Sequence, residues 1–145
     1  MAARSCPMPE GCAALGHGAI GMSYDPFQRP EASEWLQMDE AARIARVIEH
    51  HEKARIRLPN PRMHAVMHVI VENQLAEGYL AAYRALNRLL EEGLDRHEAI
   101  HAIAWVVSKE MSSVLTSEGS QNFDRTAYDQ ALGSLTAESW RRDAG

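Results

Sequence analysis

The sequence predicts an all-α fold, a compact antiparallel bundle of four to six helices that follows a disordered N-terminal tail. From about residue 34 onward, apolar residues recur at helical spacing. Pro and Gly residues stand at the points where this spacing stops. No segment shows the regular apolar-polar alternation of a half-buried strand. These three observations favour helices packed on helices.

Residues 1–23 are expected to form the disordered tail, and residues 24–145 a single helical domain. The tail is rich in Gly, Pro and Ala and has no periodicity of its own. It holds Cys6, Cys12 and His17, whose spacing matches no zinc-ligand pattern. Prolines and glycines interrupt every apolar run there, so we predict no signal peptide and a cytoplasmic location.

Two helices are expected in the first half of the domain. The first begins at about residue 34 or 39 and ends near residue 55, before the string LPNPR. The second is PRMHAVMHVIVENQLAE, with Asn60 as its N-cap and Pro61 in its first turn. Gly78 is placed to end it.

The second half of the domain is also expected to be helical. The third helix is YLAAYRALNRLLEE, ended by Gly93, and the fourth starts at Asp95 and runs through RHEAIHAIAWVVSKEMSSVL. The strings RTAYDQALGSL and TAESWRR indicate one or two short terminal helices. Short connections between the second, third and fourth helices predict antiparallel neighbours.

The charge balance restricts the classes of partner. The chain has 20 acidic and 15 basic side chains and a formal net charge of -5, without a cluster of Lys and Arg. Nucleic acids and anionic membranes need such a cluster. The longest apolar runs, such as HAVMHVIV, are far shorter than the roughly 20 residues of a membrane-spanning helix. We therefore expect no nucleic-acid or membrane partner, whereas a protein partner or a homo-oligomer stays open.

Four of the seven histidines form two i, i+4 pairs on different predicted helices. His64 and His68 lie at the edge of the apolar face of the second helix, and His97 and His101 have the same angular offset on the fourth. Side chains four residues apart on a helix are neighbours and can bind one ion. If the two edges face each other, four imidazoles converge. The spacing therefore predicts a divalent transition-metal site between the second and fourth helices.

Two further residues belong to this candidate site. Glu72 lies one turn beyond His68 and completes the string HxxxHxxxE, either as a ligand or as a group that orients a ligating imidazole. His51 lies on the core face of the first helix and is a candidate for an additional ligand or a hydrogen-bond donor behind one. His50 points elsewhere on that helix and is expected to face solvent. A histidine-rich site with one or two carboxylates favours zinc or iron.

The string HEAIH, residues 97–101, matches the HExxH motif of zinc metalloproteases, in which the glutamate activates a water. Glu98 would be the catalytic residue if the chain were a hydrolase. However, Asp95 precedes Glu98 by three residues, and Asp-x-x-Glu resembles a capping box at a helix start. No third ligand follows the motif and no strand accompanies it. We favour the capping role, and whether the chain is an enzyme stays open.

Several strings resemble a family of small bacterial helical proteins of unknown function. They are YDP, EWL, RLPNPRMHAVMHVIVENQLAEG and EEGLDRHEAIHAI, and together they carry paired HxxxHxxxE and HExxH motifs. The resemblance covers about residues 22–141 and implies that residues 1–21 lie outside the family core. It implies no reaction.

Three functions are compatible with these patterns. The favoured one is a small helical metal-binding protein, whose site is structural if four ligands enclose the ion and catalytic if one position is open. The alternatives are a metal-free interaction or regulatory module and a zinc-dependent hydrolase that uses HEAIH. Trp105, opposite the apolar face of the fourth helix, indicates either a contact surface or packing under the C-terminal string ESW.

Overall fold

The computed structural model describes residues 22–116 and 122–144, and seven helices lie in these two ranges. Their bounds are α2 Ala32–Gln37, α3 Glu40–Lys53, α4 Pro61–Ala76, α5 Leu80–Glu91, α6 Arg96–Thr116, α7 Arg125–Ser134 and α8 Ala137–Ala144. No strand occurs in the described residues, so the all-α prediction is confirmed. The tail predicted at residues 1–23 lies outside the described residues except for its last two positions.

Of the two starts predicted for the first helix, residue 34 and residue 39, the second agrees with α3, and a separate short helix, α2, precedes it. Met38 has an extended backbone, with ψ 146°, and this conformation ends α2. Asp39 then caps α3, because its carboxylate accepts a hydrogen bond from the Ala42 N–H at 2.7 Å. This cap fixes the start of α3, which apolar periodicity alone leaves open. The described residues therefore hold seven helices, one more than the upper limit of the four to six predicted.

The boundaries of α4 and α5 agree with the predictions. The Asn60 side chain accepts a hydrogen bond from the Met63 N–H at 3.0 Å, and Pro61 is the first residue of α4. Gly78 and Gly93 have φ values of 74° and 99°, in the left-handed region that a residue with a Cβ rarely adopts. Both glycines lie just after a helix, where this conformation reverses the chain.

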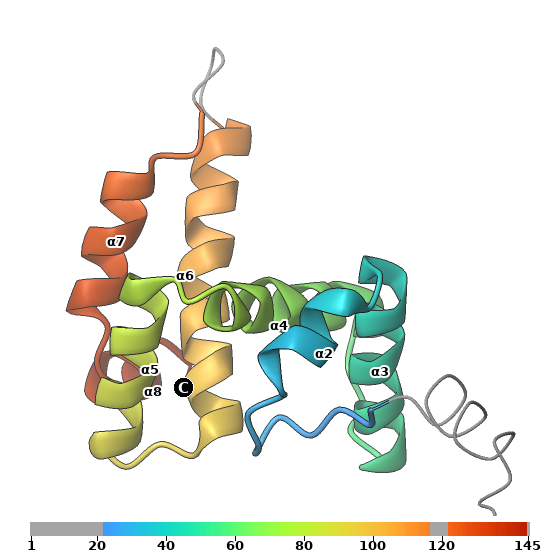
Figure 1. Ribbon diagram of the computed structural model, residues 1–145. Helices are drawn as coiled ribbons and strands as arrows, with labels where there is room; N and C mark the ends of the chain where they lie inside the picture. The colour runs from blue at the N-terminus through green and yellow to red at the C-terminus, as the bar shows by residue number, and fades with distance from the viewer. Residues whose placement is uncertain (1–21, 117–121, 145) are drawn as a thin grey trace, which may run out of the picture.

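Helix α4 runs crosswise in the fold and joins two groups of helices (Figure 1). On one side α5, α6 and α7 stand side by side, and α5 and α6 are antiparallel as predicted. On the other side α2 and α3 pack against α4. Antiparallel packing was also expected of α4, but it lies across α6 instead (Figure 1). This crossing places the middle of α4 between the two groups.

The apolar core forms two clusters that meet along α4. The larger cluster joins one face of α4, including Val71 and Leu75, to α5, α6, α7 and α8. The smaller cluster joins another face of α4, including Ala65 and Val69, to α2, α3 and the segment before α2. One helix therefore contributes apolar side chains to two cores on different sides.

The buried face of α4 differs from the predicted one. His68 and Glu72 were expected at the edge of an apolar face, but they lie inside the protein with exposed fractions of 1% and 2%. Met63, an apolar residue of the same helix, is instead 56% exposed. A helix that is covered on two sides has no single apolar stripe. The apolar periodicity of α4 therefore gave the wrong position for the middle of its buried face. The polar line of α4 faces the interior.

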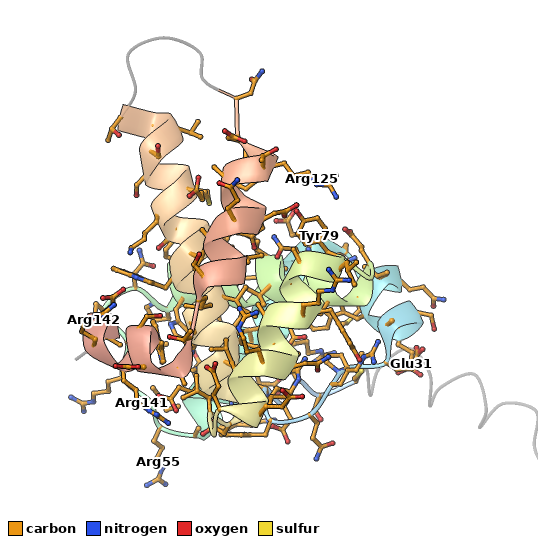
Figure 2. The ribbon with its side chains drawn as sticks, turned by 90° about the vertical axis from the view of Figure 1, so that its left-hand side faces the viewer. Glu31, Arg55, Tyr79, Arg125, Arg141 and Arg142 are labelled. Atoms are coloured by element: carbon orange, nitrogen blue, oxygen red, sulfur yellow. The ribbon has the colours of Figure 1, made fainter. Side chains whose placement is uncertain are left out.

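Helix α7 is held against α5 by polar side chains. The Tyr79 hydroxyl donates a hydrogen bond to the Asp129 carboxylate. The Arg125 guanidinium lies over the Tyr79 ring at 4.9 Å from its centre (Figure 2). Arg88 of α5 donates through Nε to the Leu135 carbonyl, 3.0 Å away, just after α7 ends. These contacts fix the far side of the larger core.

Asn73 connects α4 to α2 and α3. Its Oδ1 accepts one hydrogen bond from the Trp35 indole N–H and another from Arg43 Nη1, both at 2.9 Å. Arg43 also donates to the carbonyls of Trp35 and Leu36, near the end of α2. The Trp35 side chain fills the smaller core with an exposed fraction of 1%. A single amide oxygen therefore satisfies a buried indole and a guanidinium.

We expect Asn73→Ala to lower the free energy of unfolding by about 1–3 kcal/mol, because the buried Trp35 N–H would lose its acceptor. Asn87→Ala, on the exposed side of α5, is the matched control, since it makes the same change in a helix without a buried partner. It should alter the free energy by less than about 0.5 kcal/mol. Urea unfolding followed by circular dichroism measures both variants, and equal effects would contradict the prediction.

Candidate metal centre

Five histidines from three helices gather where the two cores meet. They are His51 of α3, His64 and His68 of α4, and His97 and His101 of α6. One nitrogen of each ring lies within 4.8 Å of the corresponding nitrogen of every other. The predicted convergence of the two i, i+4 pairs is confirmed. His51, expected as an additional member, belongs to the same five-histidine group.

Several ring nitrogens of the group are nearly in contact. His68 Nε2 lies 2.9 Å from His101 Nε2 and 3.1 Å from His64 Nε2. His64 Nε2 lies 3.1 Å from His51 Nε2. Zinc–nitrogen bonds are about 2.0–2.1 Å, which places two tetrahedral nitrogen ligands roughly 3.4 Å apart. These nitrogens need to separate by only a few tenths of an ångström to share one ion.

The backbone of α3 fixes the proton of His51. Its Nδ1 lies 2.8 Å from the carbonyl oxygen of Val47, one turn earlier in the helix. A carbonyl oxygen only accepts, so Nδ1 carries the proton and donates it. The lone pair is then on Nε2, the atom that faces His64. Helix α3 therefore presents a neutral imidazole with its metal-binding nitrogen turned inward.

A hydrogen-bond chain fixes His68 in the same way. The Tyr24 hydroxyl donates to Glu72 Oε1 at 2.8 Å, and an ionised carboxylate only accepts. The Tyr24 oxygen is therefore left to accept from His68 Nδ1, which is 3.1 Å away. His68 keeps its proton on Nδ1, and its Nε2 lone pair points into the group.

Glu72 is a buried carboxylate whose charge is balanced by Arg96. Arg96 Nη1 and Nη2 donate to the two carboxylate oxygens, each at 2.8 Å, and Nη1 also donates to the Pro26 carbonyl at 2.9 Å. Burial and the charge of Glu72 raise the pKa of Tyr24, which keeps the phenol protonated and able to donate. Predicted as a ligand or an orienting group, Glu72 lies outside the five-histidine group and bonds Tyr24 and Arg96.

Burial lowers the pKa of every histidine in the group. The imidazolium form would lose its hydration there, and the neighbouring imidazoles would repel a further positive charge. The pKa of His97 falls to about 4 and that of His101 to about 3. The pKa values of His51, His64 and His68 are lowered for the same main reason. All five rings are neutral at pH 7, which is the state in which imidazole binds a metal.

Hydrogen bonds among the rings leave one buried nitrogen of the group without a partner. The Nε2 lone pairs of His51 and His68 can accept only if His64 Nε2 and His101 Nε2 carry the protons. His97 Nε2 is buried and has no hydrogen-bond partner among the described residues. Buried nitrogens without partners are costly. A divalent cation would accept these lone pairs together, so the donor set fits a metal ion.

The HEAIH string does not act as one unit in the fold. His97 and His101 join the five-histidine group, whereas the carboxylate of Glu98 does not. Asp95 accepts a hydrogen bond from the Glu98 N–H at 2.8 Å, so the predicted cap at Asp95 is present. The reciprocal bond from the Glu98 side chain to the Asp95 N–H is absent among the described residues. Glu98 thus lies in the first turn of α6, beside the group rather than in it.

His50 is closer to the site than its place on α3 indicated. It was expected to face solvent, but its ring is partly buried, 5.3 Å from the His51 ring centre and 6.2 Å from that of His97. The Tyr24 ring centre is also 6.2 Å away. Helix α6 and the segment before α2 cover this side of α3, which α3 alone does not indicate. His50 remains outside the five-histidine group.

Tyr24 and Arg96 orient the site, and neither was predicted from the sequence. Tyr24 lies in a segment that has no regular structure, and Arg96 is the first residue of α6. One signal was available, because a carboxylate in line with two core-facing histidines needs a cation or a hydrogen-bond donor when it is buried. That requirement would have pointed to an arginine near the second histidine pair.

Comparison with known protein families, with curated proteins and with solved structures finds no match for this chain. The resemblance to small bacterial helical proteins therefore stays a prediction. Among the described residues, no helix is long and apolar enough to cross a membrane. The function has to be inferred from the chemistry of the site.

We expect the metal-free protein to lose stability as the pH falls from 7 to 5. The folded-state pKa values of the group lie below the unfolded value of about 6.5, so the unfolded chain binds protons in this range that the folded chain does not. The free energy of unfolding therefore decreases as the pH falls. Thermal melts in chelator at pH 7, 6 and 5 measure this trend.

The matched control for this pH dependence is His101→Leu, which removes one titrating ring and should give a shallower decrease. A melting temperature that stays constant between pH 7 and pH 5 in the unmodified chain would contradict the assigned protonation states.

Proposed function

We propose that this chain binds one divalent first-row transition-metal ion through the five-histidine group. The main support is the inward arrangement of five neutral imidazoles from α3, α4 and α6, with their ligand nitrogens within 4.8 Å of one another. Opposite ligands of one ion are separated by at most about 4.2 Å when bonds are near 2.1 Å. Small side-chain shifts would bring all five nitrogens, or four of them, onto the ion.

The donor set favours zinc or ferrous iron. All members of the group offer imidazole nitrogen, whereas magnesium and calcium require oxygen ligands. A closed structural zinc site uses four ligands. A fifth histidine permits either a five-coordinate ion or a four-coordinate ion with one histidine beside it. Both arrangements leave the ion accessible to an exogenous ligand when one imidazole is displaced.

Tyr24, Glu72 and Arg96 would act behind the ligands. Through the Tyr24 oxygen, the buried Glu72 carboxylate makes the His68 Nδ1–H a hydrogen-bond donor. Such a partner fixes the tautomer and orientation of a ligating histidine and raises its basicity. Arg96 in turn pairs with the Glu72 carboxylate inside the protein.

The two alternative functions have less support. A metal-free interaction module would leave the buried His97 Nε2 without a partner. A hydrolase that uses HEAIH would need the Glu98 carboxylate at the metal, and that carboxylate lies outside the group. Both alternatives make different predictions for the variants below.

We expect protein purified without a histidine tag to contain about one zinc or iron per chain, measured by plasma mass spectrometry. His68→Ala and His101→Ala should each remove most of the metal, because each loses a ligand that faces the centre of the group. His50→Ala, on the neighbouring position of α3, should keep it. After chelation, added Zn(II) should restore the metal content and raise the melting temperature of the unmodified chain.

Circular dichroism of each variant separates loss of ligand from loss of fold. A folded, unmodified chain that takes up neither Zn(II) nor Fe(II) would contradict the proposal and favour the interaction module. Glu98→Gln should retain the metal. If it instead abolished a hydrolytic activity while the metal stayed bound, the hydrolase alternative would hold.

We expect Tyr24→Phe to weaken metal affinity by about 10–100-fold, because the His68 ring loses the group that orients it. Tyr83→Phe, on the exposed surface of α5, is the matched control and should leave the affinity unchanged. Competition with a chromogenic zinc chelator measures both. Equal affinities of the two variants would show that Tyr24 does not support the centre.

A further inference from the structure

A groove of about 450 Å³ reaches the five-histidine group from the outside, between the start of α4 and the middle of α6. His64, His68 and His101 line its inner part. Small-molecule sites typically have volumes of about 300–1,000 Å³. Its apolar wall includes Met63, Met67, Trp105 and Trp140. The groove therefore combines the size of a ligand site with direct access to three candidate ligands.

The wall of the groove is apolar and carries no Asp, Glu, Lys or Arg. Two of its polar residues are engaged in their own helices. Asn60 Oδ1 accepts a hydrogen bond from the Met63 N–H, and the Ser108 hydroxyl donates one to the Trp105 carbonyl. The histidine nitrogens are thus the main polar feature that a molecule in the groove would meet.

Large apolar side chains remain exposed around the groove. Met63 is 56% exposed and Trp105 is 40% exposed. Trp105, expected either to mark a contact surface or to pack under the C-terminal segment, shares the groove with Trp140 of α8. Adjacent exposed apolar side chains mark binding sites more often than scattered ones do. An apolar molecule along this wall would remove them from water.

The charge of the proposed centre determines which chemical group of a bound molecule would meet the metal ion. Five neutral imidazoles leave the full charge of a divalent ion uncompensated. Glu72, the nearby buried carboxylate, is already paired with Arg96 at 2.8 Å. An anionic oxygen donor would therefore bind the ion more strongly than a neutral one. Apolar walls and an uncompensated cation together describe an amphiphilic anion.

We propose that the groove binds a small monocarboxylate with an apolar body, whose carboxylate coordinates the metal and whose body lies along Met63, Met67 and Trp105. This inference rests on the proposed metal centre and adds the class of its ligand. The three histidines at the inner end of the groove hold the ion on the side from which the carboxylate arrives.

The test uses the full chain loaded with Co(II), whose visible absorption changes when its ligands change. The probes are acetate, butyrate, hexanoate and octanoate, with octanamide as the uncharged analogue of octanoate. Affinity should rise roughly threefold to fourfold for each methylene that enters the groove. Octanamide should bind more weakly than octanoate by about tenfold or more. The metal-free chain should bind octanoate weakly, by calorimetry.

Met63→Glu and Met63→Gln form a matched pair at the rim of the groove, where the fold should tolerate either side chain. They have similar size and differ by one negative charge. Met63→Glu should weaken octanoate binding by about tenfold, because its carboxylate repels the ligand, and Met63→Gln should weaken it by only about threefold. Both variants should retain one Co(II) per chain.

The outcomes separate the two proposals. A chain that takes up no Co(II), Zn(II) or Fe(II) overturns the metal centre and this inference with it. A chain that binds the metal but prefers octanoate neither to acetate nor to octanamide overturns the ligand class alone. Equal octanoate affinities of the two Met63 variants would mean that octanoate binds outside this groove, and would also overturn the inference.

Discussion

The buried ion pair between Glu72 and Arg96 is the constraint on which the site depends. Glu72 is 2% exposed, and a carboxylate inside a protein that loses its partner costs about 3–5 kcal/mol. The pair connects the second half of α4 to the first residue of α6. Through Tyr24 and Pro26 it also holds the segment before α2. The crossing that brings the two histidine pairs together is therefore tied to this pair.

The five-histidine group replaces apolar packing where two cores meet. A continuous core would need apolar side chains at His68 and Glu72, because both are buried as deeply as the neighbouring valines. The protein instead places neutral rings there, and hydrogen bonds that two of them donate through Nδ1, to the Val47 carbonyl and the Tyr24 oxygen, set their tautomers. A metal ion that linked α3, α4 and α6 would then contribute to folding as well as to chemistry.

The two sides of the group differ in what surrounds them. His64, His68 and His101 line the apolar groove between α4 and α6. On the other side, the His51 and His97 rings lie 5.4 Å apart, with His50 next to both. The first side offers space for a molecule, whereas the second is filled by further imidazole rings. This difference supports a centre with histidines on both sides that a molecule reaches from the groove side.

The sequence by itself determined the helices and the partners within them. Asp39, Asn60 and Asp95 cap helices through bonds that span three residues, and the i, i+4 spacing of histidines is a property of one helix. These interactions are local, so residue order is sufficient to predict them, although the periodicity left the start of α3 open between residues 34 and 39. Equal angular offsets made a convergence of the two histidine pairs possible, on the condition that the two helix edges face each other.

Only the tertiary structure decided which face of each helix is covered. The crossing of α4 placed His68 and Glu72 in the interior and left Met63 exposed, because α4 packs on two cores instead of one. Tyr24 reaches His68 across 44 positions in the chain, and Trp140 joins Trp105 at the groove from another helix. Burial depends on which segments pack together over such separations, and periodicity within one helix carries no information about them.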